Sequence, residues 1–289
     1  MNIILGTAQF GLDYGVSNYT GQVHLNEVKN ILTLCREHGL SHFDTAQAYG
    51  DSESILGTTL RKDATITSKV PPMDNGNHKI GDWIRASVKK SISNLGRTFI
   101  DELLFHRVSD LLHGDRLEIA SALNELKTEG IIKRTGVSIY DFDNLHYLIE
   151  HFDIDVIQAP FNLFDRRLVD EGWADVIKRN NIRLDVRSVF LQGLLLMSNE
   201  QRNNYFNQWE TLWVEFDSWR MKHPNFSQLD LCLQFVKQYS QIDNVVIGVQ
   251  STSELQQVLS SFHSDKNVTM SSFKCSDINL LNPSRWNLI

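Results

Sequence analysis

The chain has 289 residues, of which 42% are hydrophobic and 22% are charged, and its formal net charge is −7. This is an ordinary composition for a globular protein, and the length suits either two domains or one large α/β barrel. Because the chain is acidic and has no block of Lys and Arg, it is a poor match for a phosphate backbone, and we expect no nucleic-acid partner.

The cysteines and the first residues bear on the cell compartment. Cys35, Cys232 and Cys275 are widely spaced and odd in number, which favours free thiols over a disulfide framework. The opening residues, MNIILGTAQFG, lack the basic region of a signal peptide. No apolar run approaches the ~20 residues of a membrane helix. We therefore expect a cytoplasmic protein with no membrane partner.

In chain order, short apolar runs alternate with segments of helical periodicity. In residues 25–39, Val28, Ile31 and Cys35 fall on one helical face and Gly39 is a suitable stop. The predicted strands are residues 2–5, 41–45, 64–70, 101–108, 132–139, 155–161, 182–190 and 244–249. The predicted helices are residues 25–39, a segment capped by Ser52, and residues 82–96, 117–130, 142–151, 170–180, 227–240 and 253–262.

This alternation is typical of parallel strands joined by helical crossovers. Its eight strand units predict a (β/α)8 TIM barrel formed by a single domain over residues 1–289. A doubly wound sheet is the alternative, but the turn after the first strand, GTAQFG, lacks the middle glycine of the G-x-G-x-x-G pattern. An extra helical segment, about 195–226, lies between the seventh strand and its helix.

Aromatic residues recur at helical spacing within this extra segment, at Trp209, Trp213 and Phe216. The segment 209–219 fits either a helix that packs its aromatic side chains on the barrel or a lid or partner surface. We favour the packed helix. The oligomeric state stays open at this point.

The chemistry of a barrel lies at the carboxyl ends of its strands. Asp44 ends the second predicted strand, with Tyr49 in the loop beyond it, and Lys69 and His106 come near the ends of the next two strands. Because buried charges are costly when unpaired, we expect Asp44 and Lys69 to pair. A nearby Lys69 would lower the pKa of Tyr49, and His106 would hydrogen-bond an oxygen at the same place. This group suits proton delivery to a carbonyl oxygen.

A metal site built from His42, Asp44 and His106 is disfavoured. His42 lies only two residues before Asp44 in a predicted strand, and the chain has no HxH pattern of histidine ligands. We expect no metal.

The stretch FDTAQAYGDSESILG, residues 43–57, resembles the D-T-A-x-x-Y-G-x-S-E-x-x-L-G signature of the aldo-keto reductase superfamily. TITSKV and LLFHRV resemble the Lys-bearing and His-bearing strands of that family. Four later stretches resemble the later strands of that family, in the same order: GVSIY, VIQAPFNLFDRR, RSVFLQGLL and VIGVQSTSELQQ. The resemblance implies a (β/α)8 barrel that reduces an aldehyde or ketone by hydride transfer from NADP(H), with NAD(H) not excluded.

The resemblance also implies roles for individual residues. Tyr49 would be the general acid, Lys69 and Asp44 its tuning pair, and His106 the group that orients the carbonyl. The small-molecule carbonyl substrate would contact Phe10, Tyr14 and Phe161. The implied cofactor-binding residues, from the nicotinamide to the adenosine, are Gly6, Thr7, Asp44, Ser138, Gln158, Arg187, Ser188, Leu191, Gly193, Gly248, Gln250, Ser251, Glu254 and Gln257.

Three positions depart from the family pattern. Ile139 stands where many members have an Asn that binds the carboxamide. Arg187 stands where many members stack an aromatic ring on the nicotinamide, and a planar guanidinium can also stack. The stretch 250–257 contains Glu254 and no basic residue to grip a 2′-phosphate, which raises NAD(H) as the cofactor.

Two other functions stay open from the sequence alone. One is a nicotinamide-binding regulatory or sensor protein with slow or vestigial reductase activity. The other is a phosphate-binding barrel isomerase or lyase that needs no nucleotide. The substrate itself is not indicated, because loop residues determine it.

Overall fold

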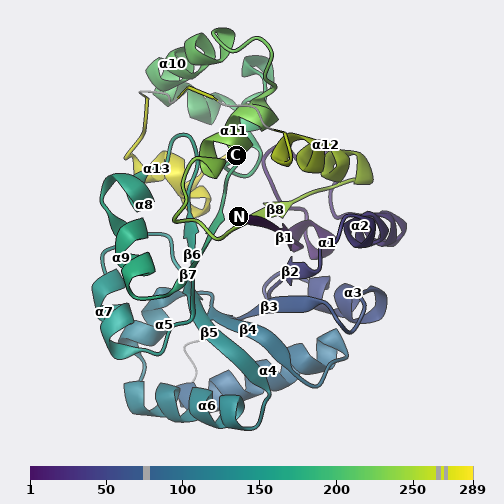
Figure 1. The fold of residues 1–289 in the computed structure, drawn as a ribbon, viewed down its shortest axis with the longest axis vertical. Helices are drawn as coiled ribbons and strands as arrows, with labels where there is room; N and C mark the ends of the chain where they lie inside the picture. Colours follow the sequence, from purple (N-terminus) through teal and green to yellow (C-terminus); the bar gives the residue numbers. More distant parts are fainter. Residues whose placement is uncertain (74–78, 265–267, 270–272, 289) are drawn as a thin grey trace.

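Eight parallel strands form a closed barrel in the computed structural model, which describes residues 1–73, 79–264, 268–269 and 273–288 (Figure 1). Each strand pairs with the next along the chain, and β8 closes the barrel by pairing with β1. The strands are β1 (Asn2–Gly6), β2 (His42–Asp44), β3 (Thr65–Val70), β4 (Ile100–Phe105), β5 (Ile132–Ser138), β6 (Val156–Pro160), β7 (Arg183–Arg187) and β8 (Asn244–Gly248). The predicted (β/α)8 barrel is confirmed.

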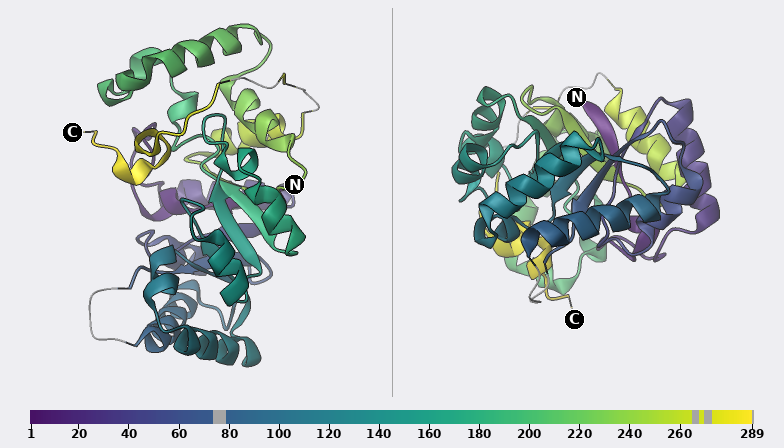
Figure 2. Two further views of the ribbon diagram at one scale, coloured as in Figure 1. Left: turned by 90° about the vertical axis from the view of Figure 1, so that its left-hand side faces the viewer. Right: turned by 90° about the horizontal axis from the view of Figure 1, so that it is seen from below.

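Helices surround the barrel and connect its strands (Figures 1 and 2). The longer ones are α2 (Leu25–Glu37), α3 (Ser52–Thr59), α4 (Ile80–Leu95), α6 (Arg116–Thr128), α7 (Leu145–His151), α9 (Trp173–Arg179), α10 (Glu210–Met221), α11 (Gln228–Lys237) and α12 (Thr252–Phe262). Short helices are α1 (Ala8–Gly11), α5 (Val108–His113), α8 (Arg167–Asp170) and α13 (Ile278–Leu281), with 3-10 turns η1 (Leu194–Leu196), η2 (Asn199–Gln201), η3 (Asn204–Trp209) and η4 (Pro283–Arg285).

Several predicted boundaries are wrong; the seventh strand, for example, ends at Arg187 rather than at residue 190. The fourth strand ends at Phe105 rather than at residue 108, because the chain turns at Arg107 into the short helix α5. Ser52 is the first residue of α3 and not its cap, because its hydroxyl is bonded to Thr7 instead of to the helix. The stop at Gly96 is as expected, since this glycine takes the left-handed conformation with φ of 58°.

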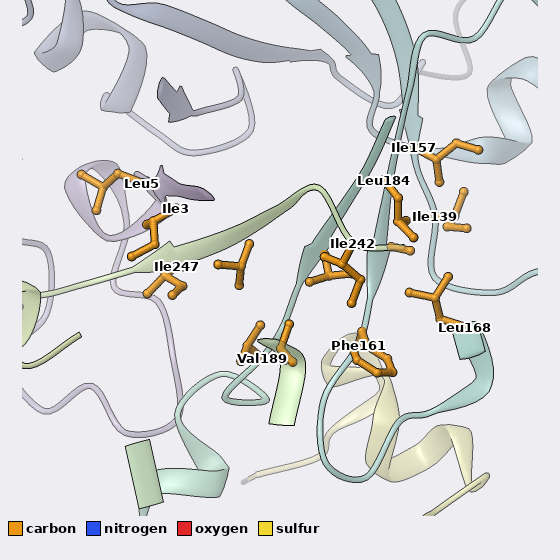
Figure 3. Packing of buried hydrophobic residues seen from close by; sticks show 14 of the residues in the cluster. Ile3, Leu5, Ile139, Ile157, Phe161, Leu168, Leu184, Val189, Ile242 and Ile247 are labelled. Carbon is orange, nitrogen blue, oxygen red and sulfur yellow. The ribbon is translucent and has the colours of Figure 1, made fainter. Parts of the chain in front are cut away.

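The apolar core lies between the strands and the helices that cover them. Ile3 and Leu5 of β1, Leu184 of β7 and Ile247 of β8 belong to it, and all four are buried (Figure 3). Burial of alternate strand residues on this side leaves the other residues of each strand for the barrel interior. The core therefore fixes which polar side chains reach the inside of the barrel.

Part of the barrel interior is filled by charged side chains. Glu102 of β4 is fully buried and accepts hydrogen bonds from Thr67 and from Arg183 of β7. Arg183 also pairs with Asp185, at 2.7 Å. His42 Nε2 and Thr67 Oγ1 share a hydrogen bond of 2.8 Å. Among the described residues, no group of three His, Cys, Asp or Glu side chains is placed to hold a metal ion.

The segment between β7 and α11 carries α10, which lies at one end of the molecule above the C-terminal residues (Figure 2). Trp213 and Phe216 are buried and contact the ring of Phe164, and Phe216 and Trp219 contact Phe273. These contacts confirm the interpretation of a packed aromatic helix.

No helix in the described ranges has both the length and the apolar character needed to span a bilayer.

Candidate active site

Neighbouring strands bring Asp44 and Lys69 together. Asp44 ends β2, and Lys69 lies one residue before the end of β3, which is paired with β2. Lys69 Nζ donates to Asp44 Oδ1 at 2.6 Å and to the backbone oxygen of Thr45 at 3.0 Å. Only 1% of the Lys69 side chain is exposed, and burial lowers its pKa while the charge of Asp44 opposes that shift. The expected ion pair is thus formed out of contact with water.

Tyr49 lies beside this pair. Its ring centroid is 5.1 Å from Lys69 Nζ, and its ring meets that of His106 edge to face, with centroids 5.7 Å apart. Burial, followed by the negative charge of Asp44, raises the pKa of Tyr49, and Arg187 opposes this only in part. The expectation of a lowered pKa is therefore wrong. At neutral pH the phenol retains its proton.

Close backbone packing holds the Tyr49 loop against α1. A β-carbon on Gly11 would overlap the backbone oxygen of Tyr49, and one on Gly50 would overlap the backbone oxygen of Gly11. Gly50 also has a positive φ of 54°. Ser52 Oγ donates to the backbone oxygen of Thr7 at 2.9 Å. The glycine and serine that follow Tyr49 in the signature therefore hold the backbone from which its ring extends.

Glu53, the next residue, was not singled out in the sequence. It is 1% exposed and accepts hydrogen bonds from Ser68 of β3 at 2.6 Å and from Asn94 of α4 at 2.9 Å. It therefore links α3 to the strand that carries Lys69. The available signal was its helical spacing from the apolar Leu56, which places both on one face.

His106 follows β4 and faces the same space as Tyr49. Its burial, together with the positive charges of Lys69 and Arg187, lowers the pKa of His106 to about 4. The ring is therefore neutral at neutral pH and has a single N–H. Its Nδ1 is buried and has no hydrogen-bond partner among the described residues. An unpaired lone pair is tolerated better than an unpaired N–H, so we place the proton on Nε2.

A chain of hydrogen bonds connects the ion pair to β5, β6 and β7. Gln158 Nε2 donates to Asp44 Oδ2 at 2.7 Å, and Ser138 Oγ donates to Gln158 Oε1 at 3.3 Å. Arg187 Nε donates to Ser138 Oγ at 3.3 Å. The pairing of β5 with β6 aligns Ser138 with Gln158. The amide and hydroxyl predicted to bind a carboxamide therefore lie side by side.

The loop after β7 has an unusual backbone. Ser188, Leu191, Gln192 and Gly193 all have positive φ, although only one of them is a glycine. Such conformations are costly for residues with a β-carbon and cluster at functional sites. The loop is closed by its own hydrogen bonds: the N–H of Leu191 donates to Ser188 O at 2.8 Å, and the N–H of Gly193 donates to Phe190 O at 2.9 Å.

The end of β8 and the start of α12 form the opposite wall. The Gln9 side chain packs directly on Gly248, where a β-carbon would overlap it. Ser251 caps α12 by accepting from the backbone N–H of Glu254 at 3.1 Å. Glu254 Oε2 accepts from the backbone N–H of Gln250 at 2.7 Å.

These groups surround one cavity of about 440 Å³ at the carboxyl ends of the strands. Its lining includes most of the predicted residues: Gly6, Thr7, Asp44, Tyr49, His106, Ser138, Gln158, Arg187, Ser188, Gly193, Gly248, Gln250, Glu254, Gln257 and Tyr14. Lys69, Leu191 and Ser251 lie outside the lining: Lys69 is behind Asp44, Leu191 is buried, and Ser251 caps a helix. Tyr140 and Gln192 line the cavity but were not predicted.

Two predicted pocket residues are corrected by the structure. Phe10 and Phe161 are fully buried and do not line the cavity. Phe161 stacks on Phe235, with centroids 5.2 Å apart, and belongs to the apolar core (Figure 3). An aromatic residue near a strand end can face either the cavity or the surrounding helices, and its residue type does not distinguish the two.

The fold and the site define a (β/α)8 barrel with a phenol, an imidazole and a buried ion pair at the carboxyl ends of its strands. The model of the Aldo/keto reductase family matches residues 2–274, and the chain belongs to this family. It is a nicotinamide-dependent oxidoreductase.

Known proteins similar to this chain share the family. The oxidoreductase YqkF of Bacillus subtilis is 24% identical over 273 residues, covering 88% of each chain. The NADH-specific methylglyoxal reductase of Escherichia coli is 28% identical over 186 residues, covering 56% of this chain and 57% of that protein. The solved structure of the aldo-keto reductase AKR11C1 from Bacillus halodurans (holo form) has a TM-score of 0.74 at 21% identity, covering 93% of this chain and 88% of the other. That structural likeness supports the barrel fold.

Proposed function

We propose that this protein reduces a small aldehyde or ketone to an alcohol, with Tyr49 as the general acid. The observation that carries the proposal is the placement of a protonated phenol between a neutral imidazole and a buried ion pair, on the wall of one cavity. A carbonyl oxygen placed there would receive a proton from Tyr49 and a hydrogen bond from His106 Nε2.

The surrounding residues support proton transfer in a defined order. The raised pKa of Tyr49 keeps its proton in place until negative charge develops on the substrate oxygen. Once Tyr49 has given up that proton, the phenolate is stabilised by the positive charge of Lys69 nearby. Asp44 balances Lys69, so that the buried cation does not lose its charge. The bound cofactor supplies the hydride to the carbonyl carbon.

The cavity walls fit a nicotinamide dinucleotide. Ser138 and Gln158 would hold the carboxamide, and Ser188 and Gly193, which line the cavity, would approach the pyrophosphate. Gly193 lets its loop pack closely against Ser17, because a β-carbon on Gly193 would overlap the Ser17 side chain. Gly248 and Gln257 would border the ribose and adenine.

We further propose NADH as the preferred cofactor, although the resemblance alone points first to NADP(H). Among the described lining residues, Arg187 is the sole Lys or Arg, and it lies near Tyr49 rather than near Glu254. A carboxylate repels a 2′-phosphate but accepts hydrogen bonds from a ribose diol. The name of the Escherichia coli relative, an NADH-specific reductase, agrees with this preference. The cytoplasmic location and the domain bounds 1–289 stay predictions.

Replacement of Tyr49 by Phe tests the general acid. We expect kcat to fall by about 10²–10⁴-fold, which is the usual contribution of a general acid. The dissociation constant for NADH, measured by fluorescence titration, should change little. Tyr147→Phe removes a phenol on the surface of α7 and serves as the matched control.

Three outcomes separate the candidate functions. Turnover of Tyr49→Phe at the wild-type rate would show that another group delivers the proton. NADH binding by the wild type without turnover of any aldehyde in a panel would favour a sensor. Failure to bind either NADH or NADPH would favour an isomerase or lyase.

A further inference from the structure

We propose that Arg187 makes this protein bind the reduced cofactor more tightly than the oxidised cofactor. The inference rests on the proposed function, because it takes the nicotinamide to occupy the catalytic end of the cavity. It concerns a property of the site that proton delivery by Tyr49 does not require.

Arg187 is held firmly at the end of β7. Its side chain donates to Ser138 Oγ at 3.3 Å, to Ser188 Oγ at 3.2 Å and to the backbone oxygen of Ile139 at 2.8 Å. The guanidinium carbon lies 4.0 Å from the centroid of the Tyr140 ring. These contacts come from two strands and the loops beyond them, so the guanidinium has a fixed position on the cavity wall.

All of these contacts are with neutral groups. Within the described parts of the chain, Arg187 forms no ion pair with a carboxylate. Asp44, the carboxylate on this part of the wall, is already engaged by Lys69 and Gln158. The positive charge of Arg187 is therefore not neutralised by the protein and acts on whatever occupies the cavity.

The reaction requires the nicotinamide ring to lie close to this charge. Hydride transfer needs the reacting atoms about 3–3.5 Å apart, and the carbonyl oxygen must reach Tyr49 and His106. Arg187 lines the same cavity as both residues and influences the pKa of each. It is also bonded to Ser138, which we assign to the carboxamide.

The two forms of the cofactor differ in charge at this ring. The reduced ring is neutral and can stack on a planar guanidinium. Loss of a hydride leaves the ring with one positive charge, which Arg187 repels. Arg187 therefore distinguishes the two forms by electrostatics. During carbonyl reduction the oxidised product is bound more weakly than the reduced form it replaces, which favours its release.

The test is the ratio of two dissociation constants. The affinity for NADH is measured by fluorescence titration and that for NAD⁺ by calorimetry, for the wild type, Arg187→Gln and Arg187→Lys. We expect the wild type to bind NADH more tightly. Arg187→Gln should reduce the ratio of the NAD⁺ constant to the NADH constant by about tenfold, chiefly through better binding of NAD⁺. Arg187→Lys keeps the charge and should largely keep the ratio.

Other outcomes are equally informative. An unchanged ratio in Arg187→Gln, or an equal loss of affinity for both forms, would overturn the inference while leaving the proposed function intact. Absence of binding by the wild type to NADH and NAD⁺, and to NADPH and NADP⁺, would instead remove the proposed function. Circular dichroism verifies folding, and Arg187→Met provides a second neutral variant if Arg187→Gln is misfolded. The phosphorylated pair of cofactors gives the same comparison, since the charge difference lies in the ring.

Discussion

The two ends of the cavity are built in different ways. At the catalytic end, Asp44 and Lys69 lie on paired strands, are buried, and are joined by a hydrogen bond of 2.6 Å. At the end that we assign to the adenosine, Gln250 and Glu254 belong to a loop and the first turn of a helix, and their hydrogen bond is exposed. Strands fix the chemical groups rigidly, whereas the loop residues that we propose to set nucleotide preference can change without disturbing the barrel.

The largest effect should come from breaking the ion pair at the rigid end. Lys69→Met leaves Asp44 buried without its cation, so we expect the free energy of unfolding to fall by about 3–5 kcal/mol. The phenolate of Tyr49 also loses its stabilising charge, so kcat should fall by about 10²–10⁴-fold. Urea denaturation and steady-state kinetics measure the two effects.

The double variant Asp44→Asn with Lys69→Met serves as the control. It has no unpaired buried charge, and it should regain most of the lost stability without regaining activity. A Lys69→Met protein as stable as the wild type would contradict the buried pair.

The ion pair at the catalytic end was also the feature most readily predicted from the sequence. Asp44 and Lys69 are charged residues at the ends of apolar strands, where a barrel gathers its functional groups, so their pairing follows from topology alone. The pKa of Tyr49 did not follow in this way. Its direction depends on how deeply the ring is buried and on its distance from Asp44, and neither is encoded in local sequence.

The loops were less predictable than the strands. Ser188, Leu191 and Gln192 adopt positive φ although none of these residue types signals it, because contacts with the surrounding structure impose the conformation. Phe161 was misplaced, since an aromatic ring just beyond a strand can face either side of the barrel wall, and Phe10 was misplaced because it lies on the buried side of α1. The short helix α5 was missed because six residues carry too little periodicity.

The second-largest effect should be a loss of folding stability at low pH that is caused by His106. Its pKa in the folded protein is lowered to about 4, against about 6.5 for an unfolded histidine. Between these pH values the unfolded chain binds a proton that the folded protein does not, so stability falls as the pH falls from 6.5 towards 4. At pH 5 the loss should be roughly 1–2 kcal/mol, and above pH 7 it should vanish.

A pair of pH series measures this contribution. Urea denaturation of the wild type and of His106→Asn between pH 5 and 7 should show a steeper decline for the wild type. Parallel curves would mean that His106 takes up its proton in the folded protein as readily as in the unfolded chain.

The smallest effect should come from the adenosine end, where Glu254→Gln removes one carboxylate from the cavity wall. The substitution keeps an oxygen that can accept from the Gln250 N–H, so the start of α12 should stay intact. Without the repulsion of the 2′-phosphate, the ratio of kcat/KM for NADPH to that for NADH should rise by about five- to tenfold.

Glu27→Gln is the matched control, because Glu27 accepts from Thr252 at the same helix start but does not line the cavity. If both variants shift the ratio equally, the preference reflects the general acidity of this region. A shift confined to Glu254→Gln would place the discrimination in direct contact with the ribose, and a ratio unchanged in both would contradict the proposed role of Glu254.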